Sequence, residues 1–209
     1  MRLRAAVALV LVAVLAGCGA RPFVDFEPEI IPGGARPDVR FTATLATQGG
    51  RLLITYKLVN AGSVAVVAYN GMQGAGLPPG SSRVGDVYVT ARKDGTVEIG
   101  KRAYEVPAGV EPAGAEVLRG TVLPPGADLT EKVPVPLPLT GRRPYLADVK
   151  LPDPIGAVTF CLGVARIDAL EAPVPQPSAG EADEKNQDTR PLFNHPSPQH
   201  LFCSDPRPL

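Results

Sequence analysis

The chain has 209 residues, a formal net charge of zero, three cysteines and no tryptophan. This balanced charge gives no electrostatic basis for binding nucleic acid, because polyanion binding depends on an excess of lysine and arginine. Glycine and proline are abundant, but 44% of the residues are hydrophobic and they alternate in short runs. That combination excludes a wholly disordered chain and favours one turn-rich β domain.

The N-terminal segment has the pattern of a secretory signal. Arg2 and Arg4 precede an uncharged run of alanine, valine and leucine that extends from residue 5 to residue 16, and such a charged start followed by a short apolar run is typical of export signals. A helix needs about 20 apolar residues to cross a bilayer. The run is shorter than that, so it predicts an export signal rather than a membrane span.

The residues Leu15-Ala16-Gly17-Cys18 resemble the lipobox of bacterial lipoproteins. The resemblance implies that residues 1–17 are removed and that Cys18 carries lipid, which anchors the chain to a membrane while the folded domain lies outside the cytoplasm. Two or three acyl chains, at about 0.8 kcal/mol per buried methylene, hold a protein stably on a membrane. Gly19 stands where inner-membrane lipoproteins often have aspartate, which favours the outer membrane in a two-membrane cell and otherwise the cell membrane. The alternative is an ordinary signal peptide that contains a cysteine.

Residues 18–37 are rich in proline and glycine and are interpreted as the lipidated cysteine and a flexible tether. From Val39 onward apolar and polar residues alternate with the period of a half-buried strand, first over residues 39–47 and then over 51–60, with a turn at Gly49-Gly50. A β-branched run follows at 64–69. Three strands are therefore expected in the first part of the domain.

Asp94-Gly95 lies between two segments in which apolar and polar residues alternate, and it predicts a hairpin with strands at 86–92 and 97–105. A two-residue type I′ turn fits this dipeptide, because both of its positions need a positive φ that Asp and Gly tolerate. Another strand is expected at 116–123, followed by a turn at 124–126.

Two later segments have distinct patterns. Residues 132–140, KVPVPLPLT, place prolines at every second position, which predicts a sheet edge or a polyproline conformation. Residues 157–167, AVTFCLGVARI, alternate bulky and small side chains and are expected to form the central strand, with Val158, Phe160, Leu162 and Val164 facing the core. The small face leaves room for another segment.

The C-terminal part, residues 172–209, begins as a proline-rich polar stretch that reads as a solvated loop and becomes apolar again at 199–203. Cys161 and Cys203 are the two cysteines other than Cys18, and in an exported chain they are expected to form a disulfide. This bond would staple the tail across the small-residue face of the central strand. The alternative is a pair of free thiols.

Residues 38–171 are therefore predicted to form an all-β, immunoglobulin-like two-sheet sandwich of seven or eight strands, similar to immunoglobulin and fibronectin III domains but lacking their core tryptophan. The order of strands and turns over residues 52–67, 86–97 and 122–133 also resembles the intracellular proteinase inhibitor family. That resemblance supports the fold and implies protease inhibition as one alternative activity.

Residues suited to catalysis or metal binding are few. His195 and His200 are the only neutral-pH bases, and both fall in the tail, where solvent exposure is expected. No nucleophile elbow, phosphate loop or zinc-protease motif occurs, so the sequence predicts no enzyme, no cofactor and no metal. The alternative is an exported enzyme or metal-binding protein that uses His195 and His200.

Binding is placed in the glycine-rich loop 70–82, where Met72 and Leu77 are expected to be exposed, because adaptable loops on a rigid sandwich often carry recognition. The five tyrosines are spread over different elements and are interpreted as packing residues. The sequence thus favours a lipid-anchored, non-enzymatic envelope protein, a binding or structural module whose partners are the membrane, through Cys18, and another envelope protein.

Overall fold

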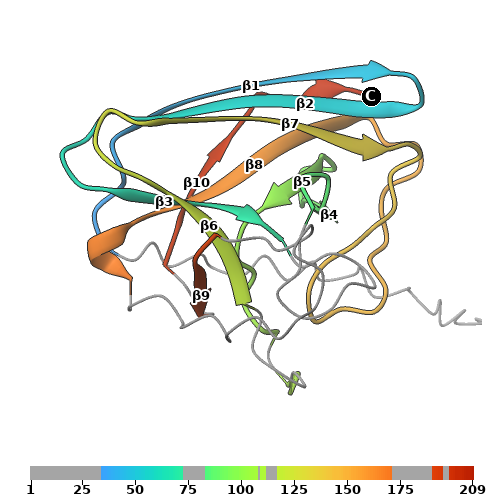
Figure 1. The fold of residues 1–209 in the computed structure, drawn as a ribbon. Helices are drawn as coiled ribbons and strands as arrows, with labels where there is room; N and C mark the ends of the chain where they lie inside the picture. Colours follow the sequence, from blue (N-terminus) through green and yellow to red (C-terminus); the bar gives the residue numbers. More distant parts are fainter. Residues whose placement is uncertain (1–33, 73–82, 108, 112–116, 171–189, 195–197) are drawn as a thin grey trace, which may run out of the picture.

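The computed structural model describes residues 34–72, 83–107, 109–111, 117–170, 190–194 and 198–209, and these residues form two packed β-sheets (Figure 1). The strands are β1 (Val39–Gln48), β2 (Arg51–Asn60), β3 (Val66–Gly71), β4 (Tyr88–Ala91), β5 (Val97–Lys101), β6 (Val117–Leu123), β7 (Asp128–Pro136), β8 (Ala157–Arg166), β9 (Leu192–Asn194), β10 (His200–Cys203) and β11 (Arg207–Pro208), with one 3₁₀ turn at Ile167–Ala169. The predicted all-β sandwich is confirmed. The described residues contain more strands than expected because β9, β10 and β11 come from the tail.

The first sheet has the order β1-β2-β7 and lies uppermost in Figure 1. β1 and β2 pair from end to end and are joined at Gly49 and Gly50, which have φ of 55° and 70° and so suit a tight hairpin turn. β7 pairs only with β2 among the described strands, and Pro134 and Pro136 lie on it. Of the two alternatives predicted for residues 132–140, a sheet edge or a polyproline conformation, the edge position is confirmed for residues 132–136.

The second sheet is built around β8, as predicted. Val164 of β8 pairs with both Ala68 and His200, and Cys161 pairs with both Gly100 and Cys203. Because a strand has two edges, β10 must occupy the edge of β8 opposite to the one that β5 and β3 share. β5 is parallel to β8 and β3 is antiparallel to it, so these two strands meet end to end along that shared edge.

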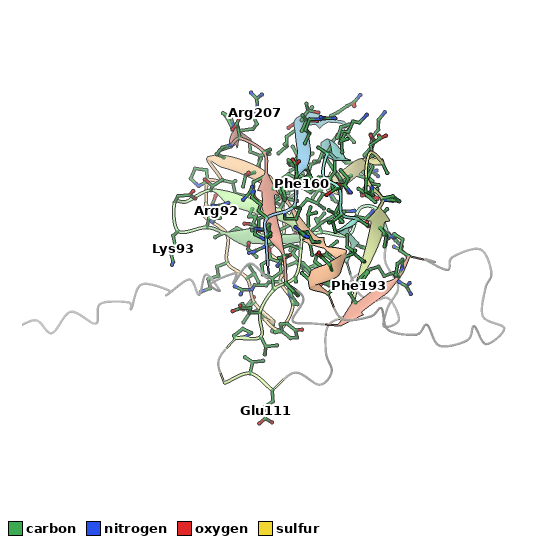
Figure 2. The ribbon with its side chains drawn as sticks, turned by 90° about the vertical axis from the view of Figure 1, so that its left-hand side faces the viewer. Arg92, Lys93, Glu111, Phe160, Phe193 and Arg207 are labelled. Atoms are coloured by element: carbon green, nitrogen blue, oxygen red, sulfur yellow. A yellow bond between two sulfur atoms is a disulfide. The ribbon has the colours of Figure 1, made fainter. Side chains whose placement is uncertain are left out.

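The main core lies between the sheets. Val158, Phe160, Leu162 and Val164 all face it, as expected from the alternation in β8. The rings of Tyr56 and Phe160 stack with centroids 5.1 Å apart, and Figure 2 shows Phe160 in the interior of the molecule. Burial of these side chains, each stabilising by about 1.5–3 kcal/mol, holds the two sheets together.

A second core covers the outer face of the β8 sheet. Tyr69, Tyr88 and Tyr104 are buried there, whereas Tyr56 lies in the main core. The interpretation of these four tyrosines as packing residues is therefore confirmed, and Tyr145 is partly buried.

Gly163 on the small face of β8 is covered closely. A Cβ atom at this position would lie 2.2 Å from Oε1 of Gln199 and 3.2 Å from Cα of Arg102. The Gln199 amide exchanges two hydrogen bonds with the Ala103 backbone, at 3.0 and 2.8 Å. The small face thus accommodates another segment, as predicted. From the tail, the Gln199 side chain covers this face, whereas β10 lies beside β8 because its backbone pairs with the free edge of that strand.

The hairpin between β4 and β5 was predicted with the wrong turn. Gly95 has φ of 82°, but Asp94 does not have a positive φ. The Gly95 amide donates to the Arg92 carbonyl and the Arg92 amide donates to the Thr96 carbonyl, which makes a three-residue loop that ends in a left-handed glycine. The Thr96 amide also donates to Oδ1 of Asp94, and this bond favours the observed turn. β5 then ends at Lys101, not at residue 105, because the chain turns there to cover the second core.

Candidate functional site

The structure corrects the position of the predicted binding residue Met72. Its side chain is fully buried in the second core, near Tyr69 and Leu118, so it is not an exposed recognition residue. The glycine-rich composition of its loop suggested exposure, but the residue follows β3 directly and continues the packing of that strand. Leu77 lies outside the described residues, as do Cys18, His195 and the signal segment 1–17.

His200 also differs from the expectation of an exposed tail residue, because only 9% of it is accessible. It pairs with Val164 in the second sheet. Burial lowers its pKa below the usual 6.5, although a hydrogen bond with the Gly34 backbone opposes that shift, and the nearby Arg36 charge lowers the pKa further. Among the described residues no group of three or more histidine, cysteine or acidic side chains is placed to hold a metal ion.

This burial of His200 predicts a pH-dependent stability. The unfolded chain takes up a proton near pH 6.5, whereas the folded chain takes it up only at lower pH, so stability decreases as the pH falls from about 7 through the folded pKa. We expect His200→Gln to reduce this loss between pH 7 and pH 5. Urea unfolding of both chains across that range measures it, and equal slopes would contradict the assignment.

Cys161 and Cys203 have their sulfur atoms 2.09 Å apart, at disulfide distance, as the sequence predicted. They are direct partners in the β8–β10 register. Cys161 is fully buried, whereas Cys203 is exposed. Ser204, the next residue of the tail, also bonds to β8, because its Oγ accepts a hydrogen bond from the Phe160 amide at 3.0 Å. The bond therefore fixes the tail along the edge of the central strand.

A buried ionic network, centred on Glu131, lies where the ends of β3 and β5 meet. The Lys101 ammonium is fully buried and lies 3.1 Å from Oε2 of Glu131. Tyr56 donates to the same oxygen at 2.5 Å, and Nδ2 of Asn70 donates to Oε1 at 2.8 Å. Lys101 also donates to the Asn70 carbonyl at 2.9 Å. The Lys101–Glu131 pair thus has hydrogen-bond partners from both sheets, Tyr56 from the first and Asn70 from the second.

Burial has opposite effects on the two titratable donors in this network. It lowers the pKa of Lys101, because desolvation penalises the ammonium, although the Glu131 charge opposes that shift. It raises the pKa of Tyr56, and the Glu131 carboxylate raises it further. Since the ammonium is enclosed, it has no surface at which a substrate could meet it. The network links the two sheets through side chains of β2, β3, β5 and β7.

A second charged cluster lies on the outer face of the β8 sheet. Glu98 is 4% exposed, lies 2.8 Å from Nε of Arg102 and accepts from the Tyr104 hydroxyl at 3.2 Å. The Arg102 guanidinium stacks over the Tyr104 ring at 4.1 Å. Nη1 of Arg92, a residue labelled in Figure 2, lies 3.6 Å from Oε2 of Glu98. These contacts also tie the second core together rather than forming an open site.

An accessible candidate site among the described residues is a hollow of about 520 Å³ at the seam where β1 of one sheet faces β10 of the other. We call it the seam hollow; it is lined by Arg36, Pro37, Asp38, Val39, Phe41, Leu201, Phe202 and Cys203. Phe41 and Phe202 are only partly buried, with ring centroids 6.5 Å apart. The exposed Arg36 guanidinium stacks over Phe202 at 4.6 Å. The sequence did not single out this site, because its residues come from opposite ends of the domain.

In the described part of the chain, the fold and these sites define an all-β sandwich with a cysteine-linked tail, internal charged clusters and an open hollow at a sheet seam. Comparison with known proteins finds no family model, curated protein or solved structure that matches the chain. Among the described residues, no helix has the length and apolar character that crossing a membrane requires.

Proposed function

We propose that the chain is an exported, lipid-anchored protein of the bacterial cell envelope that acts as a non-enzymatic binding or structural module. The observation that carries the proposal is the Cys161–Cys203 pair at disulfide distance, because disulfides persist in oxidising compartments outside the cytoplasm. This agrees with the export signal over residues 1–17 and with the lipobox that ends at Cys18.

The N-terminal sequence supports an anchor that leaves the sandwich free to meet a partner. Gly34, where the described chain begins, follows Cys18 by 16 residue steps along the sequence. At about 3.5 Å per residue a chain of this length extends up to roughly 55 Å. The described chain starts beside the seam hollow, since Arg36 and Pro37 line it, so a partner of the hollow would bind near the anchored end of the domain.

Binding without catalysis is supported by where the charged groups lie. Lys101, Glu98 and Arg102 are enclosed, and they form ion pairs: Lys101 with Glu131 and Arg102 with Glu98. The seam hollow instead presents partly buried aromatic rings and an exposed guanidinium. Aromatic and arginine side chains are enriched where proteins bind proteins. The partner class that fits is therefore another envelope protein.

Substitution of Cys18 tests the anchor. We expect Cys18→Ser to move the protein from the membrane fraction to the soluble fraction and to abolish the mass increase from acyl chains, because no thiol remains for lipid attachment. Membrane fractionation and intact-mass measurement of the chain from bacterial cells check both effects. Cys203→Ser is the matched control and should leave anchoring unchanged. A wild-type chain that retains residues 1–17, or lacks lipid on Cys18, would contradict the proposal.

A further inference from the structure

β1 presents a long strand edge that the described residues do not pair. The strand runs for ten residues and forms an unbroken register with β2, without a bulge. The other edge of β1 has no partner strand in the described part of the chain. Such an edge offers a row of backbone donors and acceptors to any further strand.

The other described sheet edges are protected in ways that β1 is not. β7, the opposite edge of the same sheet, carries Pro134 and Pro136 together with the charged residues Asp128 and Lys132. β4, β9, β10 and β11 have between two and four residues each. β1 has no proline, and its one charged residue is Arg40. Natural sheets use proline, charge and short length to prevent edge pairing, so their joint absence from one edge indicates that this edge pairs.

We propose that β1 pairs antiparallel with β1 of a second copy of this chain, which joins the two three-stranded sheets into one continuous sheet. In the register that places Ala43 opposite Ala43, Phe41 lies opposite Leu45 and Thr42 lies opposite Thr44. Arg40 then faces Ala46 and does not meet a second arginine. The strand is therefore complementary to itself, because like side chains pair on each face and no like charges meet.

The burial pattern of β1 agrees with this partner. Val39, Phe41, Ala43 and Leu45 face the main core but are only partly buried, while Arg40, Thr42, Thr44 and Ala46 are exposed. In the paired sheet the inward residues of one copy cover those of the other at the open side of the sandwich. The pairing removes apolar surface from water, and it gives the free backbone N–H and C=O groups of β1 hydrogen-bond partners. Both effects favour association.

The anchor geometry permits the same pairing on a membrane; this step rests on the proposed function. In the Ala43 register the two Val39 residues are about 27 Å apart, at about 3.4 Å per residue. Each tether of about 16 residues reaches farther than that separation, so both copies can be held in one membrane. Confinement to one surface raises their effective concentration and thereby strengthens a weak pairing.

Charge placed on the edge tests the proposal. We expect Thr42→Lys with Thr44→Lys to weaken self-association roughly tenfold or more, because two pairs of lysines would face each other across the interface. Thr42→Lys with Thr44→Glu is the matched control: it places lysine opposite glutamate and should retain the dimer. Both threonines are exposed, so thermal unfolding of each variant verifies that the fold is unchanged.

The measurement is sedimentation equilibrium of the full processed chain in mild detergent, over a range of protein concentrations, with crosslinking in membranes before extraction. A dimeric wild type, a monomeric double-lysine variant and a dimeric lysine–glutamate variant support the proposal. A monomeric wild type, an unaffected double-lysine variant, a monomeric lysine–glutamate variant, or crosslinks from β1 only to a different protein overturn it. Lipid on Cys18 is measured separately by mass, and a chain without lipid is sedimented without detergent, so failure of the anchor does not decide the pairing.

Discussion

Replacing Lys101 with methionine is expected to lower the free energy of unfolding by about 3 kcal/mol. The substitution removes the ammonium that lies 3.1 Å from Glu131 and leaves a carboxylate between the sheets without its closest cation. Breaking a buried ion pair on one side costs about 3–5 kcal/mol. The lower end applies here because Tyr56 and Asn70 still donate hydrogen bonds to Glu131. Urea unfolding at pH 7 measures the loss.

The double variant Lys101→Met with Glu131→Leu shows whether that cost comes from the unpaired charge. Replacing both partners with apolar side chains removes the uncompensated carboxylate, so the double variant should be more stable than Lys101→Met alone. Lys132→Met is the matched control, because Lys132 is exposed on the opposite face of β7, and we expect it to change stability by less than about 0.5 kcal/mol. A Lys101→Met protein as stable as wild type would mean that the pair contributes nothing.

The fold was predictable for strands in which two kinds of side chain alternate strictly, so that each face of the strand carries one kind. β8 alternates bulky and small residues, so its central position and its core face could be predicted before the structure. The prolines of β7 placed that strand at an edge for a chemical reason, the missing backbone donors. The tail strands were not predicted, because β9 has three residues and β11 has two, and their pairing depends on distant partners rather than on a local pattern.

The charged network was missed, although its signal is present in the sequence. Lys101 shares its strand face with Val97 and Ile99, and Glu131 shares its face with Leu129 and Val133. A lysine and a glutamate that each occupy a core-facing position of an alternating strand predict a buried pair. The seam hollow had no such signal. Residues 36–41 and 201–203 come together only through the packing of the two sheets, which local sequence does not encode.

The sequence also overestimated exposure near the strand ends. Met72 and His200 both lie next to glycine-rich or proline-rich segments, and that composition suggested solvent. Met72 instead extends the packing of β3, and His200 begins β10. Composition reports the average character of a segment, whereas burial is decided by the strand to which each residue belongs.

Removing the Cys161–Cys203 bond is the second change with a large expected effect, a loss of about 2–4 kcal/mol in the free energy of unfolding. The two cysteines are separated by 42 residues, and a cross-link over a loop of this length restricts the unfolded chain by roughly 4 kcal/mol in the loop-closure description. Cys203→Ser is the preferred variant because Cys203 is exposed, so the buried Cys161 keeps its packing.

The position of the disulfide predicts which part of the domain loses stability first when the bond is removed. Without it, β10 is held to β8 by a four-residue ladder and by the Ser204 hydrogen bonds, so the amides of Leu201 and Phe202 should exchange with solvent faster than those of β2 or β3. Hydrogen exchange of Cys203→Ser and of the reduced wild type should give the same pattern. If exchange increases equally in β2 and β10, the bond stabilises the whole domain and does not fix the tail in particular. If exchange increases in neither strand, pairing with β8 alone holds the tail.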